Sequence, residues 1–141
     1  MKEFSTSIDI AATPANVWAI LLETAKWPEW DPFTEKIEGK VALGAKVKAF
    51  SKLSPGRGFG VTVTQLVPNE TMVWTGGMPF GLFKGERTYT LVADAGGTTK
   101  FAMREVFGGP MLALIGKSIP DMTEAFASFA RGLKARAEGS R

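Results

Sequence analysis

The sequence predicts an α+β fold in which a curved antiparallel sheet wraps around one long C-terminal helix. Two observations support this prediction. Residues 3–107 contain a series of short segments in which apolar and polar side chains alternate between turn residues, as antiparallel strands do. Residues 118–136 instead repeat apolar side chains every three or four positions, as an amphipathic helix does. Because a twisted sheet of this length curls, its concave face can bury the apolar side of the helix.

The predicted order begins with one strand and two short helices. Residues 3–10 alternate in period two, so one face of this strand is buried. Thr13 and Pro14 are an N-cap and a first-turn residue, and Trp18 lies on the apolar side of the helix that follows, where we expect it to join the core. Residues 27–32 hold two tryptophans and two prolines, too much apolar surface for a loop that stays in water.

Six further strands follow, and consecutive strands are joined by short turns. The predicted strands are residues 33–39, 45–50, 59–67, 72–76, 85–93 and 98–107. Residues 68–70 and 94–97 are rich in the turn formers Pro, Asn, Asp and Gly. Such connections imply an antiparallel meander. Residues 111–115 then form a short apolar helical turn before the long helix.

The long helix is predicted over residues 118–136. Ser118 is its expected N-cap, Pro120 lies in the first turn, and Glu124 lies near the positive end of the helix dipole. Arg136 and other basic residues lie at the negative end. The apolar stripe that faces the sheet consists of Ile119, Met122, Phe126, Phe129 and Leu133.

Composition excludes several classes of chemistry and favours one domain over residues 1–141. The chain has no Cys and no His, so it has no disulfide, no imidazole base and no thiolate or histidine ligands for zinc. We expect no metal and no cofactor. The formal charge of +3 is too small and too evenly spread to predict nucleic-acid binding. No apolar run is long enough for a membrane span, and residues 1–5 lack a secretion signal, so we expect a cytoplasmic protein.

Several motifs lie along the chain, at residues 8–18, 27–32, 67–74, 97–99 and 104–109, with Gly39 and Gly44. Together they resemble the START/Bet v 1-like (SRPBCC) superfamily, in particular its polyketide cyclase/dehydrase-like branch. The resemblance covers nearly the whole chain and implies a helix-grip fold, in which seven antiparallel strands grip the C-terminal helix above an apolar cavity. Members of the superfamily bind lipids, sterols, polyketides or hormones, and a few catalyse cyclisation or dehydration. Fold alone does not decide between these functions.

The predicted hairpin around residues 94–97 places one charged pair among apolar side chains. If Leu91 pairs with Phe101, then Tyr89 faces Met103 and Arg87 faces Glu105, all on one face of the sheet. Most of this face is apolar, which favours the concave side. The charged pair is then either an ion pair at the sheet rim or a group that anchors or protonates a ligand at the cavity mouth.

Eleven residues are candidates for ligand contact. Met72 and Trp74 share a strand face, and Trp30 resembles the tryptophan that closes one end of the cavity in the superfamily; plain core packing is the alternative for each. Residues 76–82 and 111–115 are two apolar, glycine-flanked segments that could part to admit a ligand, or form a self-packed loop or a dimer contact. The complete candidate set is Trp30, Met72, Trp74, Met78, Phe80, Phe83, Tyr89, Met103, Met111, Met122 and Phe126.

Three functions remain open from the sequence. The first is binding of a small hydrophobic molecule of lipid, polyketide or aromatic type, without catalysis. The second is a cyclase or dehydratase with Glu105 as the acid–base group and Arg87 or Tyr89 stabilising a developing enolate. The third is a protein-interaction module of co-chaperone type, in which the apolar segments form an interface. A homodimer is possible in each case.

Overall fold

A computed structural model describes residues 2–139 of the 141-residue chain. The first residue and the last two residues of the predicted domain therefore lie outside the described range. One seven-stranded sheet has the order β1-β7-β6-β5-β4-β3-β2, and every neighbouring pair is antiparallel. Its strands are β1 (Lys2–Ile10), β2 (Thr34–Glu38), β3 (Lys46–Ser51), β4 (Gly58–Val67), β5 (Thr71–Gly77), β6 (Lys84–Ala93) and β7 (Thr99–Gly108).

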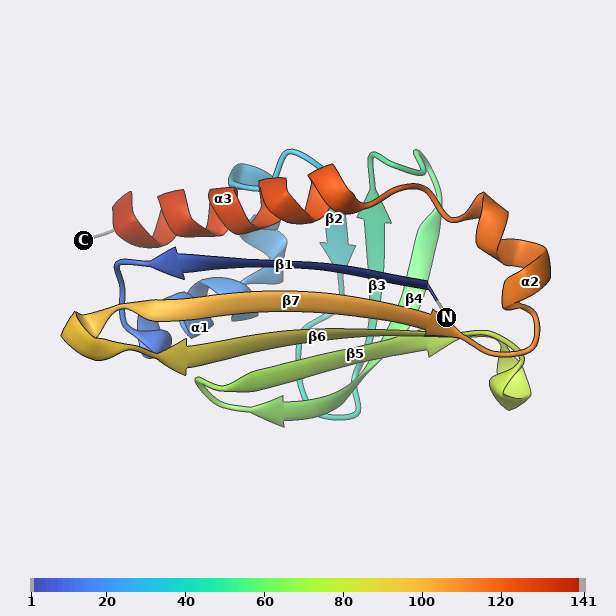
Figure 1. Cartoon of the computed structure of the whole chain (residues 1–141), viewed down its shortest axis with the longest axis horizontal. Helices are drawn as coiled ribbons and strands as arrows, with labels where there is room; N and C mark the ends of the chain where they lie inside the picture. The colour runs from blue at the N-terminus through green and yellow to red at the C-terminus, as the bar shows by residue number, and fades with distance from the viewer. Residues whose placement is uncertain (1, 140–141) are drawn as a thin grey trace.

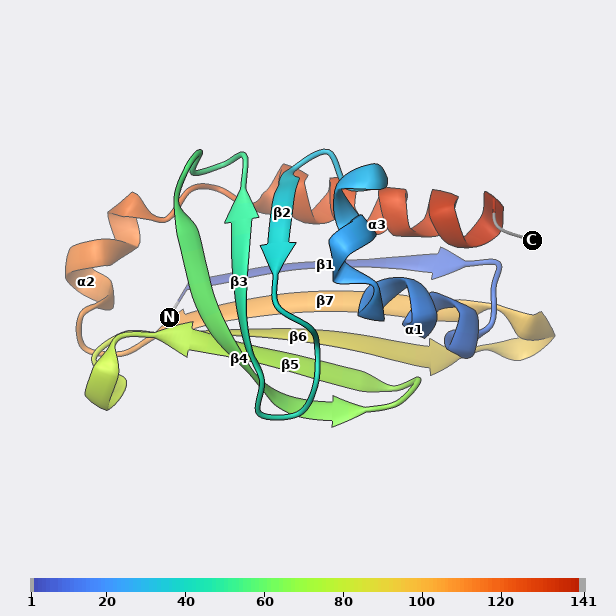
Figure 2. The ribbon, with the colours of Figure 1, turned by 180° about the vertical axis from the view of Figure 1, so that it is seen from behind.

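Within residues 2–139, three α-helices and four short 3-10 helices connect or cover the strands. The α-helices are α1 (Pro14–Leu22), α2 (Leu112–Ile115) and α3 (Thr123–Gly139), and the 3-10 helices are η1 (Thr24–Glu29), η2 (Pro79–Gly81), η3 (Ala95–Gly97) and η4 (Gly116–Ser118). In Figure 1, α3 runs alongside β1, while α2 and the η2 loop lie together at the opposite end from the C-terminus. Figure 2 shows β2, β3 and β4 crossing steeply over the direction of β6 and β7, so the sheet curls around an interior.

The predicted helix-grip architecture is confirmed, and each observed strand end lies within one residue of its predicted position. The two short helices after the first strand are α1 and η1. Thr13 caps α1, because its Oγ1 accepts a hydrogen bond from the backbone N–H of Asn16 at 3.3 Å. Trp18 lies in the core with 6% of its surface exposed, as predicted.

The predicted start of the long helix at Ser118 is wrong. Ser118 belongs to η4, where its Oγ donates to the Ile115 carbonyl at 2.7 Å, and α3 begins at Thr123. Ile119 is extended, with φ −77° and ψ 119°, because the ring of the following Pro120 disfavours helical geometry at the residue before it. Asp121 acts at the helix start instead, since its Oδ1 accepts from the Thr123 N–H at 2.9 Å.

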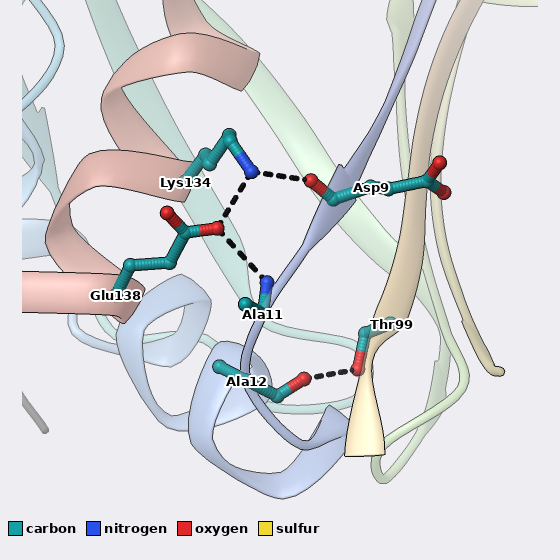
Figure 3. Close-up of polar contacts among 6 residues, drawn as sticks. All are labelled: Asp9, Ala11, Ala12, Thr99, Lys134 and Glu138. Atoms are coloured by element: carbon teal, nitrogen blue, oxygen red, sulfur yellow. Dashed lines mark hydrogen bonds and ion pairs between the residues drawn. The ribbon is translucent and has the colours of Figure 1, made fainter. Parts of the chain in front are cut away.

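Polar contacts hold the last turns of α3 to the end of β1 (Figure 3). Glu138 Oε2 accepts from the Ala11 N–H at 2.9 Å and from Lys134 Nζ at 2.6 Å, and Lys134 Nζ also donates to the Asp9 carbonyl at 2.8 Å. Close by, the buried Thr99 hydroxyl donates to the Ala12 carbonyl at 2.7 Å. These contacts satisfy backbone groups where the chain leaves the sheet, and they fix the direction of α3.

An aromatic cluster occupies the middle of the interior. Trp27 stacks on Trp74, with 5.3 Å between ring centroids and 6° between planes. Phe129 of α3 meets the edge of Trp27 at 5.0 Å and of Trp30 at 4.9 Å. The Trp27 Nε1–H donates to the Leu21 carbonyl at 3.2 Å, which joins the cluster to α1. The cluster therefore links sheet, short helices and long helix in one core.

Candidate functional site

A cavity of about 530 Å³ lies between the inner face of the sheet and the N-terminal half of α3. Apolar side chains of several elements form most of its wall. Its floor comes from β5, β6 and β7, one side comes from β2, β3 and β4, and its roof comes from α3 and the segment before it. Exposed residues such as Arg57 and Phe59 lie at its rim, so the cavity is open to solvent on that side.

Two glycines on the inner face help to create this space. Gly76 and Gly85 pair across β5 and β6; Gly76 follows Trp74 by two residues and Gly85 precedes Arg87 by two, so all four share the same inner face. Neither carries a side chain that would project into the cavity. A Cβ added to Gly85 would lie 3.1 Å from the Phe107 ring, which shows that this ring lies over the glycine.

The predicted hairpin register is confirmed, and it brings the charged pair into the cavity wall. Arg87 pairs with Glu105 across β6 and β7, and their side chains form a hydrogen-bonded ion pair with 2.7 Å between Nη2 and Oε1. Only 26% and 14% of the two side chains are exposed, and both residues line the cavity. The guanidinium also lies over the Phe126 ring, 5.0 Å from its centroid.

Burial and charge shift two pKa values at this pair. Burial alone would lower the pKa of Arg87, but the Glu105 carboxylate, with help from Tyr89, outweighs it and holds the pKa above its usual range. Arg87 is therefore a permanent cation. Burial raises the pKa of Tyr89 to about 12, against an opposing effect of the Arg87 charge. Tyr89 is a neutral phenol at any physiological pH.

Three polar atoms beside this pair have no hydrogen-bond partner of good geometry among the described residues. They are Trp74 Nε1, Arg87 Nε and the Tyr89 hydroxyl, and all three are buried. Trp74 and Arg87 are cross-strand partners, and Arg87 and Tyr89 are two residues apart on β6, so the three side chains are neighbours on the inner face. The Tyr89 hydroxyl and the Arg87 guanidinium still interact electrostatically, but buried polar groups that make no well-formed hydrogen bond are unusual in a folded interior.

Asp31 is a buried carboxyl at the cavity that the sequence reasoning missed. It lines the cavity and is 4% exposed. Its oxygens accept from the Phe33 N–H at 3.2 Å and from the Thr34 hydroxyl at 2.6 Å. Burial raises the pKa of Asp31, against lowering by these hydrogen bonds and by Arg87 and Lys52. A signal existed in its position next to Trp30, inside a segment too apolar to be exposed.

The cavity brings together eight of the predicted site residues. They are Trp74, Met78, Phe83, Arg87, Met103, Glu105, Met122 and Phe126.

Five others do not line it. Met72 and Tyr89 lie deeper in the core, at 0% and 1% exposure, and Trp30 packs behind Phe129. Phe80 points fully outward, with 99% of its surface exposed. Met111 is half-buried outside the cavity lining, and its N–H donates to the Leu82 carbonyl at 2.8 Å.

The two apolar segments at residues 76–82 and 111–115, which the sequence left open as an entrance, a self-packed loop or a dimer contact, lie side by side at the cavity's α2 end. The Met111–Leu82 hydrogen bond joins them, and Met78 and Ile115 from the two segments line the cavity. Phe80 has a left-handed backbone, with φ 61°, which turns its ring away from the molecule. Leu114 is also strongly exposed, at 76%.

Lining residues contributed by β2, β3 and β4 were not predicted. They include Ile37, Ala49, Phe59 and Val61. The local pattern of each strand marks one face as buried, but only the curl of the whole sheet brings those faces opposite α3.

Within residues 2–139, no group of three or more His, Cys, Asp or Glu residues is arranged to hold a metal ion. None of the helices in this range combines the length and the apolar character needed to cross a bilayer.

Comparison with known proteins gives one family and many structures. A family model described as polyketide cyclase / dehydrase and lipid transport matches residues 1–138. No curated protein matches the chain in sequence. A START superfamily protein from Mycobacterium smegmatis has TM-score 0.72 and 15% identity, with 99% of each chain covered.

Two further solved structures are similarly close. The Zhui aromatase/cyclase from Streptomyces sp. R1128 has TM-score 0.72 and 14% identity, covering 97% of this chain and 93% of that one. The Aha1 dimer from Colwellia psychrerythraea has TM-score 0.72 and 22% identity, covering 98% and 97%. At these identities the likeness concerns the fold, which all three share with this chain.

Proposed function

Because this chain belongs to the polyketide cyclase/dehydrase and lipid transport family, we propose that it binds a small hydrophobic molecule in the cavity beneath α3. One observation carries the proposal. The cavity of about 530 Å³ is lined mainly by apolar and aromatic side chains and includes the buried Arg87–Glu105 ion pair in its wall, which is the usual character of a small-molecule site. A lipid, polyketide or aromatic compound would pack against these apolar side chains.

A pair of alanine variants on α3 tests the proposal. Ala125 lines the cavity, whereas Ala135 lies on the exposed side of the same helix. Ala125→Phe should fill the space and weaken binding of the uncharged fluorescent probe N-phenyl-1-naphthylamine by about tenfold or more, whereas Ala135→Phe should not change it. Native mass spectrometry of the wild-type protein would show whether a molecule is carried through purification. Equal affinity in both variants would contradict the proposal.

A second candidate is a cyclase or dehydratase, because Glu105 lies in the cavity wall against Arg87. Glu105 would act as the acid–base group on a poly-β-ketone substrate, and Arg87 would stabilise the enolate. Glu105→Gln should abolish turnover of such a substrate and leave binding of N-phenyl-1-naphthylamine within about twofold. Turnover that survives the substitution would remove Glu105 from this role.

A protein interface is the third candidate, and the exposed Phe80 and Leu114 are the observation that favours it. The Aha1 relative is described as a dimer. If this surface forms a homodimer, Phe80→Ser should abolish a concentration-dependent dimer in analytical ultracentrifugation.

The cytoplasmic location of the protein stays a prediction.

A further inference from the structure

Two buried donors in the cavity wall, Trp74 Nε1 and Arg87 Nε, have no hydrogen-bond partner of good geometry among the described residues, and they indicate what else the ligand must contain. Both atoms can only donate a hydrogen bond; the Tyr89 hydroxyl lies outside the cavity lining, where it interacts with Arg87. A buried donor without a partner destabilises the fold by about as much as a lost hydrogen bond. An acceptor oxygen placed among them would remove this cost. A purely apolar ligand would leave it in place.

The charge of the site limits the kind of oxygen. Glu105 already neutralises Arg87 at 2.7 Å, and Asp31 is a second buried carboxyl on the same cavity. A ligand carboxylate placed beside Trp74 and Arg87 would add negative charge next to these two carboxyls, because the other cation that lines the cavity, Arg57, lies out at the exposed rim. Burying such a charge is strongly unfavourable, so the charge balance favours an uncharged acceptor.

We infer that the cavity selects a hydrophobic molecule bearing an uncharged carbonyl oxygen, which accepts hydrogen bonds from Trp74 Nε1 and Arg87 Nε. This inference rests on the proposed binding function and names its ligand class. The two donors belong to cross-strand partners that both line the cavity, so they lie on the same part of its wall. Trp74 is held in place by its stack on Trp27, which makes its N–H a fixed reference for the ligand.

Three probes of nearly equal shape test this selection. They are 2-acetylnaphthalene, with a neutral carbonyl; 2-ethylnaphthalene, with no acceptor; and 2-naphthoate, with a carboxylate. A cavity without a polar anchor binds the ethyl compound most tightly, because a carbonyl loses its bonds to water on burial. We expect the reverse order here, with the acetyl compound bound tightest and the naphthoate at least about tenfold weaker at pH 7.

Trp74→Phe removes the donor and keeps an aromatic ring. It should weaken 2-acetylnaphthalene about tenfold and leave 2-ethylnaphthalene within about twofold. Trp18→Phe is the matched control, since Trp18 is buried in the core but does not line the cavity; it should leave the order of affinities intact. Circular dichroism checks that both variants fold. If Trp74→Phe does not fold, the order in which the wild-type protein binds the three probes still tests the carbonyl selection.

The outcomes separate the carbonyl selection from the proposed binding of a hydrophobic molecule. Tighter binding of 2-ethylnaphthalene or of 2-naphthoate to the wild-type protein would overturn the carbonyl selection while leaving hydrophobic binding in place. An acetyl preference that survives in Trp74→Phe would overturn the role of Trp74. Failure of all three probes to bind would count against the proposed function, and this inference would fall with it.

Discussion

The space between α3 and the sheet is packed at one end and hollow at the other, and neighbouring rows of side chains show the difference. In the packed row, Met72, Tyr89 and Met103 pair across β5, β6 and β7, and each is at most 1% exposed. Four residues further along the strands, the same positions hold Gly76, Gly85 and Phe107.

The backbone register is continuous through both rows, so backbone geometry does not explain why one row is packed and the other hollow. The difference lies in the volume of the side chains that occupy these positions. The row between them, Trp74, Arg87 and Glu105, lines the cavity together with Met103 at the edge of the packed row, so close packing ends there. Polar side chains at such a boundary are partly solvated, which lowers the cost of placing an ion pair inside the fold.

Truncation at the packed end should give the largest change in stability. Leu133 of α3 is fully buried, and Leu133→Ala should lower the free energy of unfolding by about 3 kcal/mol, because it leaves a new void in a filled region. Met122→Ala on the cavity side should lower it by about 1 kcal/mol or less, since space already exists there. Urea denaturation measures both. Equal losses would contradict the contrast between the two ends.

The titration of Tyr89 tests whether water reaches the packed row of Met72, Tyr89 and Met103. The folded pKa of about 12 lies above the unfolded value near 10. The stability due to this group is therefore complete below pH 10 and is lost as the pH rises from 10 to 12, because the unfolded chain releases the proton first. The chain has a single tyrosine, so tyrosinate absorbance reports this residue alone. Ionisation near pH 10 in a protein that is still folded would show that water reaches the row.

Removal of one partner tests the boundary row. Arg87→Met should lower the free energy of unfolding by about 2 kcal/mol, because Glu105 is left buried without its cation. The double variant Arg87→Met, Glu105→Met should recover most of this loss, since two apolar side chains then extend the packed region. A double variant that is less stable than the single variant would mean that the ion pair contributes more to the free energy of unfolding than the burial of its two charges costs.

The smallest expected effect concerns the contacts in Figure 3. Glu138→Ala removes the hydrogen bond to the Ala11 N–H and the contact with Lys134, and should lower the free energy of unfolding by about 1 kcal/mol. Glu124→Ala, which breaks an exposed ion pair with Arg131 on the same helix, is the control and should change it by less than about 0.5 kcal/mol. A similar effect of both would show that the packed end does not depend on these contacts.

Local patterns predicted most of the fold because period-two alternation and turn residues act over short distances. The pairing of Arg87 with Glu105 followed from one hairpin register, and it was confirmed. The start of α3 was missed because the effect of Pro120 on Ile119 outweighed a good capping residue at position 118.

The cavity wall was harder to predict, because it depends on how far the sheet curls. Trp27, which belongs to η1, lines the cavity, whereas Trp30 directly follows η1 and packs against Phe129. Residues of β2 to β4 reach the cavity through the curvature of the whole sheet, which no single segment encodes. The buried Asp31 was missed because an aspartate in a proline-rich loop is usually exposed.

The stack of Trp27 on Trp74 also gives the molecule an optical signature. Two indoles in van der Waals contact couple their electronic transitions, and this coupling depends on the separation and mutual orientation of the rings. Trp74 borders the cavity on one side and its stacking partner on the other. Any occupant that tilts this indole therefore changes the circular dichroism and the fluorescence of the pair, so filling of the cavity can be followed without a label.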